Sequence, residues 1–134
     1  MLNEKLIPKI IHSTNETKTN EVLMDGSVKK DIYTKTIFIS SLPSSSGSTQ
    51  YNHNISNVDK IWIDASNTFL TNPSGEFQPY VWIHPTLITS GFGITQTGSI
   101  TVDVPTRTNF RINVGQDRST WGAYVTLRYT KTTN

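Results

Sequence analysis

Aromatic and imidazole rings recur at every second position near the end of the segment Phe77 to His84. Alternate side chains of an extended strand lie on one face, so Tyr80, Trp82 and His84 are expected together on the solvent side. Such rings stack on the apolar faces of sugars while nearby polar groups bind the hydroxyls. This pattern predicts a carbohydrate-binding strip. The alternative is that Trp82 fills the core or an interface between copies of the chain.

A second pair with the same chemistry is formed by Trp62 and Asp64. Ile61 and Ile63 alternate with them and are expected to face the core, which leaves Trp62 and Asp64 on the outer side. An aromatic ring beside a carboxylate also suits a sugar ligand. Here too the alternative is a tryptophan that serves packing alone.

Recognisable catalytic and metal-binding motifs are missing from the sequence. His12, His53 and His84 lie in different segments without metal-ligand spacing, and the chain has no cysteine. There is no Gly-x-Ser-x-Gly nucleophile motif and no glycine-rich phosphate loop before a helix. The 10 carboxylates are scattered, and their positions in the sequence cannot show a glycosidase pair. We predict a protein that is not an enzyme and that needs no cofactor or metal.

The charge pattern argues against two classes of partner. The net charge is +2, and Lys29-Lys30 is the only pair of adjacent basic residues, so the basic cluster expected of a nucleic-acid-binding protein is missing. No apolar run is long enough to span a bilayer, and Met1 to Lys9 lacks the hydrophobic region of a signal peptide. We expect no nucleic-acid partner, no membrane insertion and synthesis in a cytoplasm.

The elements that must position these residues are predicted to be strands. Trp121 to Asn134 alternates strictly, with Trp121, Ala123, Val125, Leu127 and Tyr129 on a core face and Tyr124, Thr126, Arg128 and Thr130 on a solvent face. Further strands are expected over Glu21 to Met24, Val28 to Lys30, Asp31 to Ser40, Val58 to Asp64, Phe77 to His84, Ile100 to Val104 and Phe110 to Val114. Strand signals that recur about every 8 to 12 residues are typical of a sandwich or barrel. The sequence therefore predicts an all-β, antiparallel, jelly-roll-like β-sandwich.

Turn and loop signals separate these strands. Asp25-Gly26 predicts a tight hairpin between the first two strands. Ser41 to Thr49 and Asn67 to Gly75 are expected to be loops by composition, and Pro85 is expected to end the strand before it.

The first twenty residues differ from the rest of the chain. Leu2, Leu6, Ile7, Ile10 and Ile11 are apolar residues in a segment too short to form its own core, and a polar run from His12 to Asn20 follows. Apolar residues in such a segment need a surface to cover them. We predict an N-terminal docking arm and linker over residues 1–20 and a β-sandwich head domain over residues 21–134. The alternative for Ile7 to Ile11 is an ordinary edge strand.

The strand Asp31 to Ser40 is apolar on both faces, and a two-layer sandwich covers only one of them. A neighbouring copy of the chain is the simplest source of the second cover, so we expect an oligomer.

Three segments of the chain resemble the C-terminal head domains of phage and prophage tail-fibre and baseplate proteins. They are Glu21 to Thr36 with its Asp-Gly turn, Asn52 to Ile61, and the closing strand Tyr124 to Thr133; a polar lead, His12 to Glu16, precedes them. The likeness covers residues 12–134. One departure is the turn, where Leu23 to Val28 replaces the Trp-Ile-Asp-Gly-Lys-Pro that is usual in such domains.

The resemblance implies a homotrimeric virion protein, made in the host cytoplasm and released by lysis, whose head binds polysaccharide on the host surface. The arm residues Leu2, Leu6, Ile7, Ile10 and Ile11 would then dock on other virion proteins. Such heads usually end a long fibre, whereas only residues 1–20 precede this one. A short tail-fibre or baseplate appendage is therefore expected, with a purely structural capsid head-fibre or decoration protein as one alternative. A monomeric carbohydrate-binding module is the other.

Overall fold

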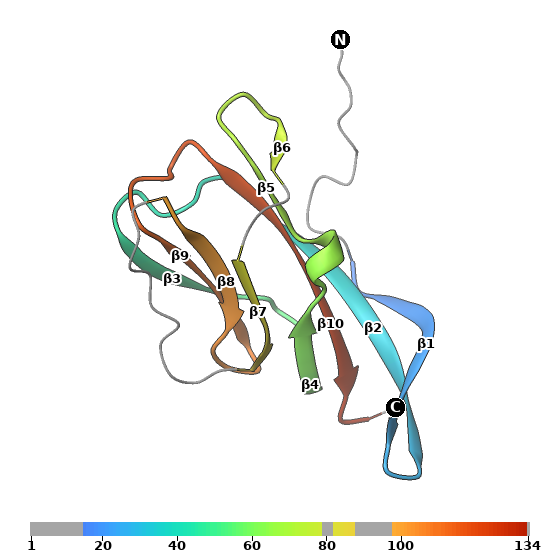
Figure 1. Ribbon diagram of the computed structural model, residues 1–134. Coiled ribbons are helices and arrows are strands. Elements are labelled where there is room, and N and C mark those ends of the chain that lie inside the picture. The colour runs from blue at the N-terminus through green and yellow to red at the C-terminus, as the bar shows by residue number, and fades with distance from the viewer. Residues whose placement is uncertain (1–14, 79–81, 88–97, 134) are drawn as a thin grey trace.

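Nearly all regular structure among the described residues is β-strand (Figure 1). The structure is a computed structural model that describes residues 15–78, 82–87 and 98–133, with the backbone alone for some residues of β7. Its strands are β1 (Thr17–Asp25), β2 (Val28–Ile39), β3 (Gly47–Asn52), β4 (Val58–Ile63), β5 (Phe69–Thr71), β6 (Phe77–Gln78), β7 (Trp82–Leu87), β8 (Ile100–Val104), β9 (Asn109–Val114) and β10 (Gly122–Lys131). The helical element among the described residues is one 3-10 turn, η2 (Ala65–Asn67).

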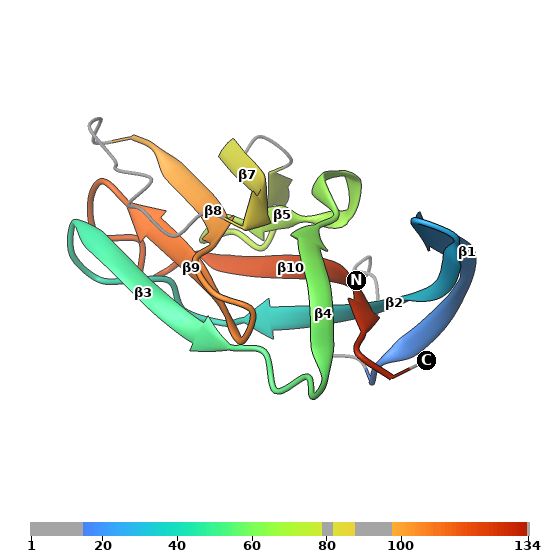
Figure 2. The ribbon, with the colours of Figure 1, turned by 90° about the horizontal axis from the view of Figure 1, so that it is seen from below.

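The strands form two sheets that pack face to face (Figures 1 and 2). The larger sheet has the order β1-β2-β10-β5-β6, and β4 also pairs with β10, beyond β5 along the same edge. The smaller sheet has the order β3-β9-β8-β7. The prediction of an all-β, two-layer domain is confirmed. The pairing is antiparallel except between β7 and β8, which run parallel.

The core lies between the sheets and is filled by the predicted alternating positions. β10 contributes Ala123, Val125, Leu127 and Tyr129, β8 contributes Ile100, Val102 and Val104, and β9 contributes Phe110, Ile112 and Val114. Ile61, Ile63 and Leu70 complete the side of the larger sheet. Each fully buried aliphatic or aromatic side chain of this size stabilises the fold by roughly 1.5 to 3 kcal/mol relative to exposure.

The other face of β10 is not in solvent, and that prediction is wrong. Tyr124 and Thr126 are each 5% exposed, and Thr130 is fully buried. The reason is that residues from β2, from β5 and from the turn η2 fold over this face, as the hydrogen bonds and ring contacts described below demonstrate. Strand β10 is therefore covered on both faces.

The hairpin predicted at Asp25-Gly26 is confirmed. Asp25 pairs with Val28, and Gly26 occupies the first loop position with a φ of 67°, which a glycine adopts without strain. The first strand begins at Thr17, so residues 17–20, expected to be linker, belong to β1. Just before it, the Glu16 carboxylate accepts hydrogen bonds from the Tyr129 hydroxyl and the Lys131 ammonium.

Two strand predictions in the middle of the chain are wrong. The stretch expected as one strand, Phe77 to His84, is divided between β6 in the larger sheet and β7 in the smaller one. Pro85 does not end β7, which continues to Leu87 with a register shift between Ile83 and Leu87. A proline is tolerated there because β7 is an edge strand of the described sheet, where a missing N–H costs no ladder bond.

Two of the expected loops also contain strand. The segment Asn67 to Gly75 includes β5, and the segment Ser41 to Thr49 includes the start of β3. Both short strands are stabilised by pairing with distant partners, β10 and β9, which local composition does not reveal.

His53 is a buried histidine that joins two loops at one end of the sandwich. It is 1% exposed; its Nδ1 accepts the Ile55 N–H, and its Nε2 lies 2.6 Å from the carbonyl oxygen of Arg107. A carbonyl only accepts, so Nε2 carries the proton and the ring is neutral. Burial lowers the pKa of His53, the Arg107 carbonyl opposes that shift, and the charge of Lys35 adds to it.

Gly122 occupies a position where no side chain fits. A Cβ atom there would lie 2.8 Å from the Thr71 hydroxyl oxygen and 2.9 Å from the backbone carbonyl oxygen of Ile39. Both distances are shorter than any ordinary carbon contact, and the second is to backbone. The close approach of β10 to its two neighbours therefore requires glycine.

The first prediction concerns this contact. Gly122→Ala should lower the free energy of unfolding by about 1 to 3 kcal/mol because the added methyl group overpacks the sheet. Urea unfolding measures the change. Gly98→Ala is the matched control, since a Cβ at Gly98 meets open space, and it should change stability by less than about 0.5 kcal/mol. Equal effects of the two substitutions would contradict the claim that position 122 has no room for a side chain.

The second prediction concerns pH. Because the pKa of His53 is lowered in the folded state, the unfolded chain binds a proton first as the pH falls below about 6.5. The stabilising contribution of the neutral ring is complete above that pH and is lost as the pH falls toward the folded-state pKa. Denaturation midpoints between pH 8 and pH 5.5 should fall more steeply for the wild type than for His53→Gln. Parallel curves for the two proteins would show that His53 does not titrate in this way.

Candidate functional site

The outer face of the larger sheet carries a groove above β10. It is lined by side chains from β2, β5 and β10, by Asp64 at the end of β4 and by Asn67 of η2, and its volume is about 260 Å³. We call it the outer groove; its lining residues are Thr34, Thr36, Asp64, Asn67, Phe69, Tyr124, Thr126 and Arg128. The register of the sheet explains this set, because Tyr124 pairs with Phe69 on one side, and Thr126 and Arg128 pair with Thr36 and Thr34 on the other.

The floor of the groove is a network of hydroxyl groups. The Thr126 hydroxyl donates to the carbonyl oxygen of Asn67 at 2.7 Å. The hydroxyl oxygens of Thr36 and Thr126 lie 2.9 Å apart. The backbone N–H of Thr126 donates to the Thr68 hydroxyl oxygen, which in turn donates to the carbonyl oxygen of Asp64. Buried polar groups are stable only with such partners, so the network holds β10, β2 and η2 together beneath the groove.

One end of the groove is charged. The Arg128 guanidinium forms ion pairs with Glu21 of β1 and with Asp64, the latter at 3.8 Å. The Asp64 carboxylate also accepts hydrogen bonds from the Ser66 hydroxyl and the Asn67 amide, each at 2.8 Å. These bonds fix Asp64 at the start of η2. Arg128 brings N–H donors and Asp64 brings acceptor oxygens to the same end of the groove.

The other end of the groove is aromatic. The Tyr124 ring stacks on Phe69 with centroids 5.1 Å apart, and Phe38 packs against Tyr124 at 4.8 Å. Phe77 of β6 extends the cluster, with its ring centroid 4.6 Å from that of Phe69. Burial raises the pKa of the Tyr124 phenol, so the hydroxyl stays neutral at physiological pH.

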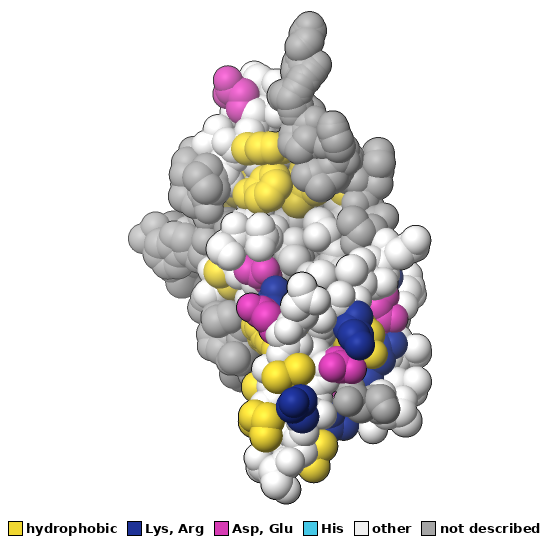
Figure 3. All heavy atoms as spheres, turned by 90° about the vertical axis from the view of Figure 1, so that its right-hand side faces the viewer, with side chains coloured by type: hydrophobic (Ala, Val, Ile, Leu, Met, Phe, Trp, Pro, Cys, Tyr) yellow, Lys and Arg dark blue, Asp and Glu magenta, His cyan; other side chains and the backbone are white. Residues whose placement is uncertain are grey.

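Figure 3 shows the same division on the molecular surface. Hydrophobic side chains gather near the β5–β6 end of this face, and a mixed group of acidic and basic side chains lies farther along it. Surface that is neither hydrophobic nor charged lies between them. The outer groove thus combines aromatic rings, hydroxyl and amide groups, and one ion-paired arginine.

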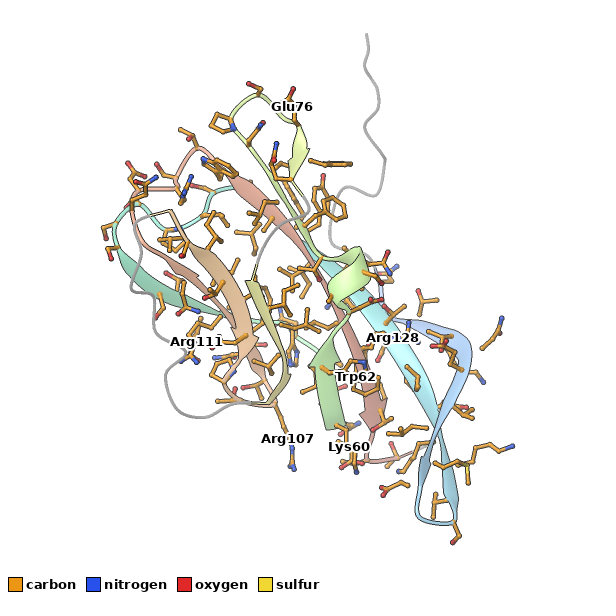
Figure 4. The ribbon with its side chains drawn as sticks, in the orientation of Figure 1. Lys60, Trp62, Glu76, Arg107, Arg111 and Arg128 are labelled. Atoms are coloured by element: carbon orange, nitrogen blue, oxygen red, sulfur yellow. The ribbon has the colours of Figure 1, made fainter. Side chains whose placement is uncertain are left out.

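Only part of the predicted site is brought together here. Asp64 lines the groove. Trp62 pairs directly with Arg128 on the neighbouring strand, is half-buried and lies beside the charged end (Figure 4). Trp82 and His84 belong to β7 in the other sheet, where the structure describes their backbone, and Tyr80 lies outside the described residues.

Several groove residues were missed by the sequence analysis. Thr126, Tyr124 and Arg128 were expected on a solvent face. The sequence therefore predicted that they share a face of β10, but it did not predict that other residues cover that face. Phe69 and Asn67 fell in a segment read as a turn. The available signal was the alternation of Thr34 and Thr36 with core residues of the same strand, which places two hydroxyls on the outer face.

The remaining sequence predictions concern other parts of the chain. The proposed docking residues Leu2, Leu6, Ile7, Ile10 and Ile11 lie outside the described residues. Within residues 15–78, 82–87 and 98–133, no group of three or more His, Asp or Glu residues is arranged to hold a metal ion. In the same ranges, no helix has the length and apolar character needed to cross a membrane.

Comparison of the chain with known protein families, with curated proteins and with solved structures found no match. The function is therefore inferred from the chemistry of the outer groove and from the resemblance of the sequence segments described above.

Proposed function

We propose that this chain is a carbohydrate-binding head protein of a phage virion, with the outer groove as the sugar site. The observation that carries the proposal is the lining of the groove, where Phe69 and Tyr124 lie beside Thr36, Asn67 and the Asp64–Arg128 pair. A sugar has apolar C–H faces and a rim of hydroxyls, so it needs rings and polar groups in the same small space.

The size of the groove supports a small polar ligand. Its volume of about 260 Å³ lies just below the roughly 300 to 1,000 Å³ of pockets that hold drug-sized molecules. The hydroxyl network and the ion pairs form part of the folded sheet, so the polar groups are already oriented before a ligand arrives. A site organised in advance loses less conformational entropy on binding.

The sequence resemblance supplies the biological setting of the proposal. A homotrimeric, jelly-roll-like head would present three grooves, and the residues before β1 would form the arm that docks on the particle. Several linked weak sites gain avidity, often by 10² or more, because the second binding event becomes intramolecular. We infer a short tail-fibre or baseplate-type appendage whose ligand is polysaccharide on the host surface.

An exposed apolar surface supports assembly with other copies of the chain. Val22, Met24 and Val28 of the β1–β2 hairpin are 45%, 56% and 54% exposed, respectively. The hairpin projects from the end of the larger sheet, away from β3, β8 and β9 (Figure 1). Val22 and Met24 share one face of the hairpin, and Val28 lies on the other. Neighbouring exposed apolar side chains mark interaction sites more often than isolated ones do.

The third prediction tests the sugar site. The wild-type protein should bind polysaccharide purified from the host surface, and Arg128→Gln should weaken binding about tenfold or more through loss of charged hydrogen bonds. Lys60→Gln is the matched control, because Lys60 forms exposed ion pairs with Asp25 and Asp59 away from the groove. Calorimetry measures binding, and thermal melting verifies that both variants fold.

The result separates the proposal from its alternatives. Equal binding by Arg128→Gln and the wild type would place the site elsewhere. A protein that binds no glycan, from particles that adsorb normally without it, would be a structural decoration protein. Release of reducing ends from the polysaccharide would instead identify an enzyme.

The fourth prediction tests self-assembly. Light scattering of the wild type should give three times the mass of the chain, and the combined Val22→Ser, Met24→Ser and Val28→Ser variant should give the mass of one chain. Its circular dichroism should stay that of the wild type, since these side chains lie outside the core. A wild type that is a monomer at micromolar concentration would favour a carbohydrate-binding module acting alone.

A further inference from the structure

The aromatic cluster extends beyond the outer groove. Phe69 and Tyr124 line the groove, whereas Phe77 does not. The ring centroid of Phe77 nevertheless lies 4.6 Å from that of Phe69 and 5.9 Å from that of Tyr124. Phe77 is 39% exposed, more than any other aromatic side chain that the structure describes; the side chain of Trp82 is not among them. The three rings therefore form a continuous row that begins inside the groove and ends at the exposed ring of Phe77.

The register of the sheet gives the length of this path. Phe77 pairs with Thr71, which pairs with Gly122, so Phe77 lies level with Gly122 of β10. Arg128 lies six residues farther along β10, which corresponds to about 20 Å at 3.3 to 3.4 Å per residue. A single sugar ring cannot contact both ends of such a path. A chain of linked sugars can do so.

The charges along the path select the class of sugar. Arg128 is paired with both Glu21 and Asp64, so its positive charge is already balanced by two carboxylates. At the other end, Glu76 is fixed next to Phe77, where its carboxylate accepts a hydrogen bond from the Asn72 amide at 2.9 Å. Figure 4 places Glu76 at the β5–β6 end and Arg128 at the opposite end. The named carboxylates outnumber the cation, so an anionic sugar gains nothing here.

We propose that Phe77, packed against Phe69, forms a second subsite beyond the groove, and that the ligand is an uncharged oligosaccharide of more than two sugar units. One unit occupies the polar end of the groove, and a unit farther along the same saccharide chain stacks its apolar face on the exposed ring of Phe77. This inference rests on the proposed sugar-binding function and adds the length and the charge of the ligand.

The test is an affinity series on the full chain. The probes are mono-, di- and trisaccharides of glucose, galactose, mannose, rhamnose and N-acetylglucosamine immobilised on a glycan array, together with the uronic acids of glucose, galactose and mannose. For the sugar type that binds, affinity should rise from the monosaccharide to the trisaccharide, and the uronic acids should bind more weakly than their neutral counterparts. Phe77→Ala should remove about three- to tenfold of the affinity for the longer ligand and leave that for the monosaccharide unchanged.

Two variants keep the test decisive. Phe77→Tyr retains a flat ring at the same position, so it should keep the gain in affinity with length. Lys60→Gln, at an exposed position away from the groove, should behave as the wild type. If Phe77→Ala does not fold, the comparison of Phe77→Tyr with Phe77→Leu replaces it, because leucine keeps the apolar volume and lacks the ring.

The outcomes separate this inference from the proposed sugar-binding function on which it rests. Binding that does not depend on length, or that is stronger for the uronic acids, overturns the second subsite or its neutral ligand while the sugar site itself stands. Absence of binding to every saccharide overturns the proposed function and this inference together.

Discussion

Strand β10 must be covered on both faces, and most of the molecule is arranged around that requirement. Its inner residues meet the smaller sheet in the core, as one face of any sandwich strand does. Its outer residues are covered by side chains of β2 and β5, by Asp64 and by the turn η2. Gly122 lets the neighbouring strands approach closely at one end, and the Arg128 ion pairs tie β1 and Asp64 to the other.

The groove is a consequence of how the outer face is covered. The residues above β10 are mainly polar, so they are held by specific hydrogen bonds and ion pairs and do not pack into a second apolar core. Thr126 illustrates this, because its hydroxyl and its N–H are both bonded to the segment around η2. Where the aromatic rings of Phe69 and Tyr124 meet this polar layer, a ligand with both kinds of surface finds complementary groups.

Local alternation in the sequence was enough to predict the class of the fold and the core positions of β8, β9 and β10, and the Asp25-Gly26 dipeptide was enough to predict the first hairpin. It failed where a strand depends on a distant partner, as β5 depends on β10, or where an edge position tolerates Pro85. The same limit applies to the site. Asp64 was identified from its own strand, but its relation to Arg128 arises from pairing between segments 64 residues apart in the chain. Burial of Tyr124 likewise depends on Phe38 and Phe69, which local sequence does not place beside it.

The most direct test of the account is to locate the bound sugar by NMR. Backbone amide shifts of the labelled protein would be followed while neutral oligosaccharides are added. The account predicts that the largest changes fall on Asn67, Phe69, Thr126 and Arg128, over the outer face of β10. Changes confined to the smaller sheet, at β7, β8 or β9, would contradict it.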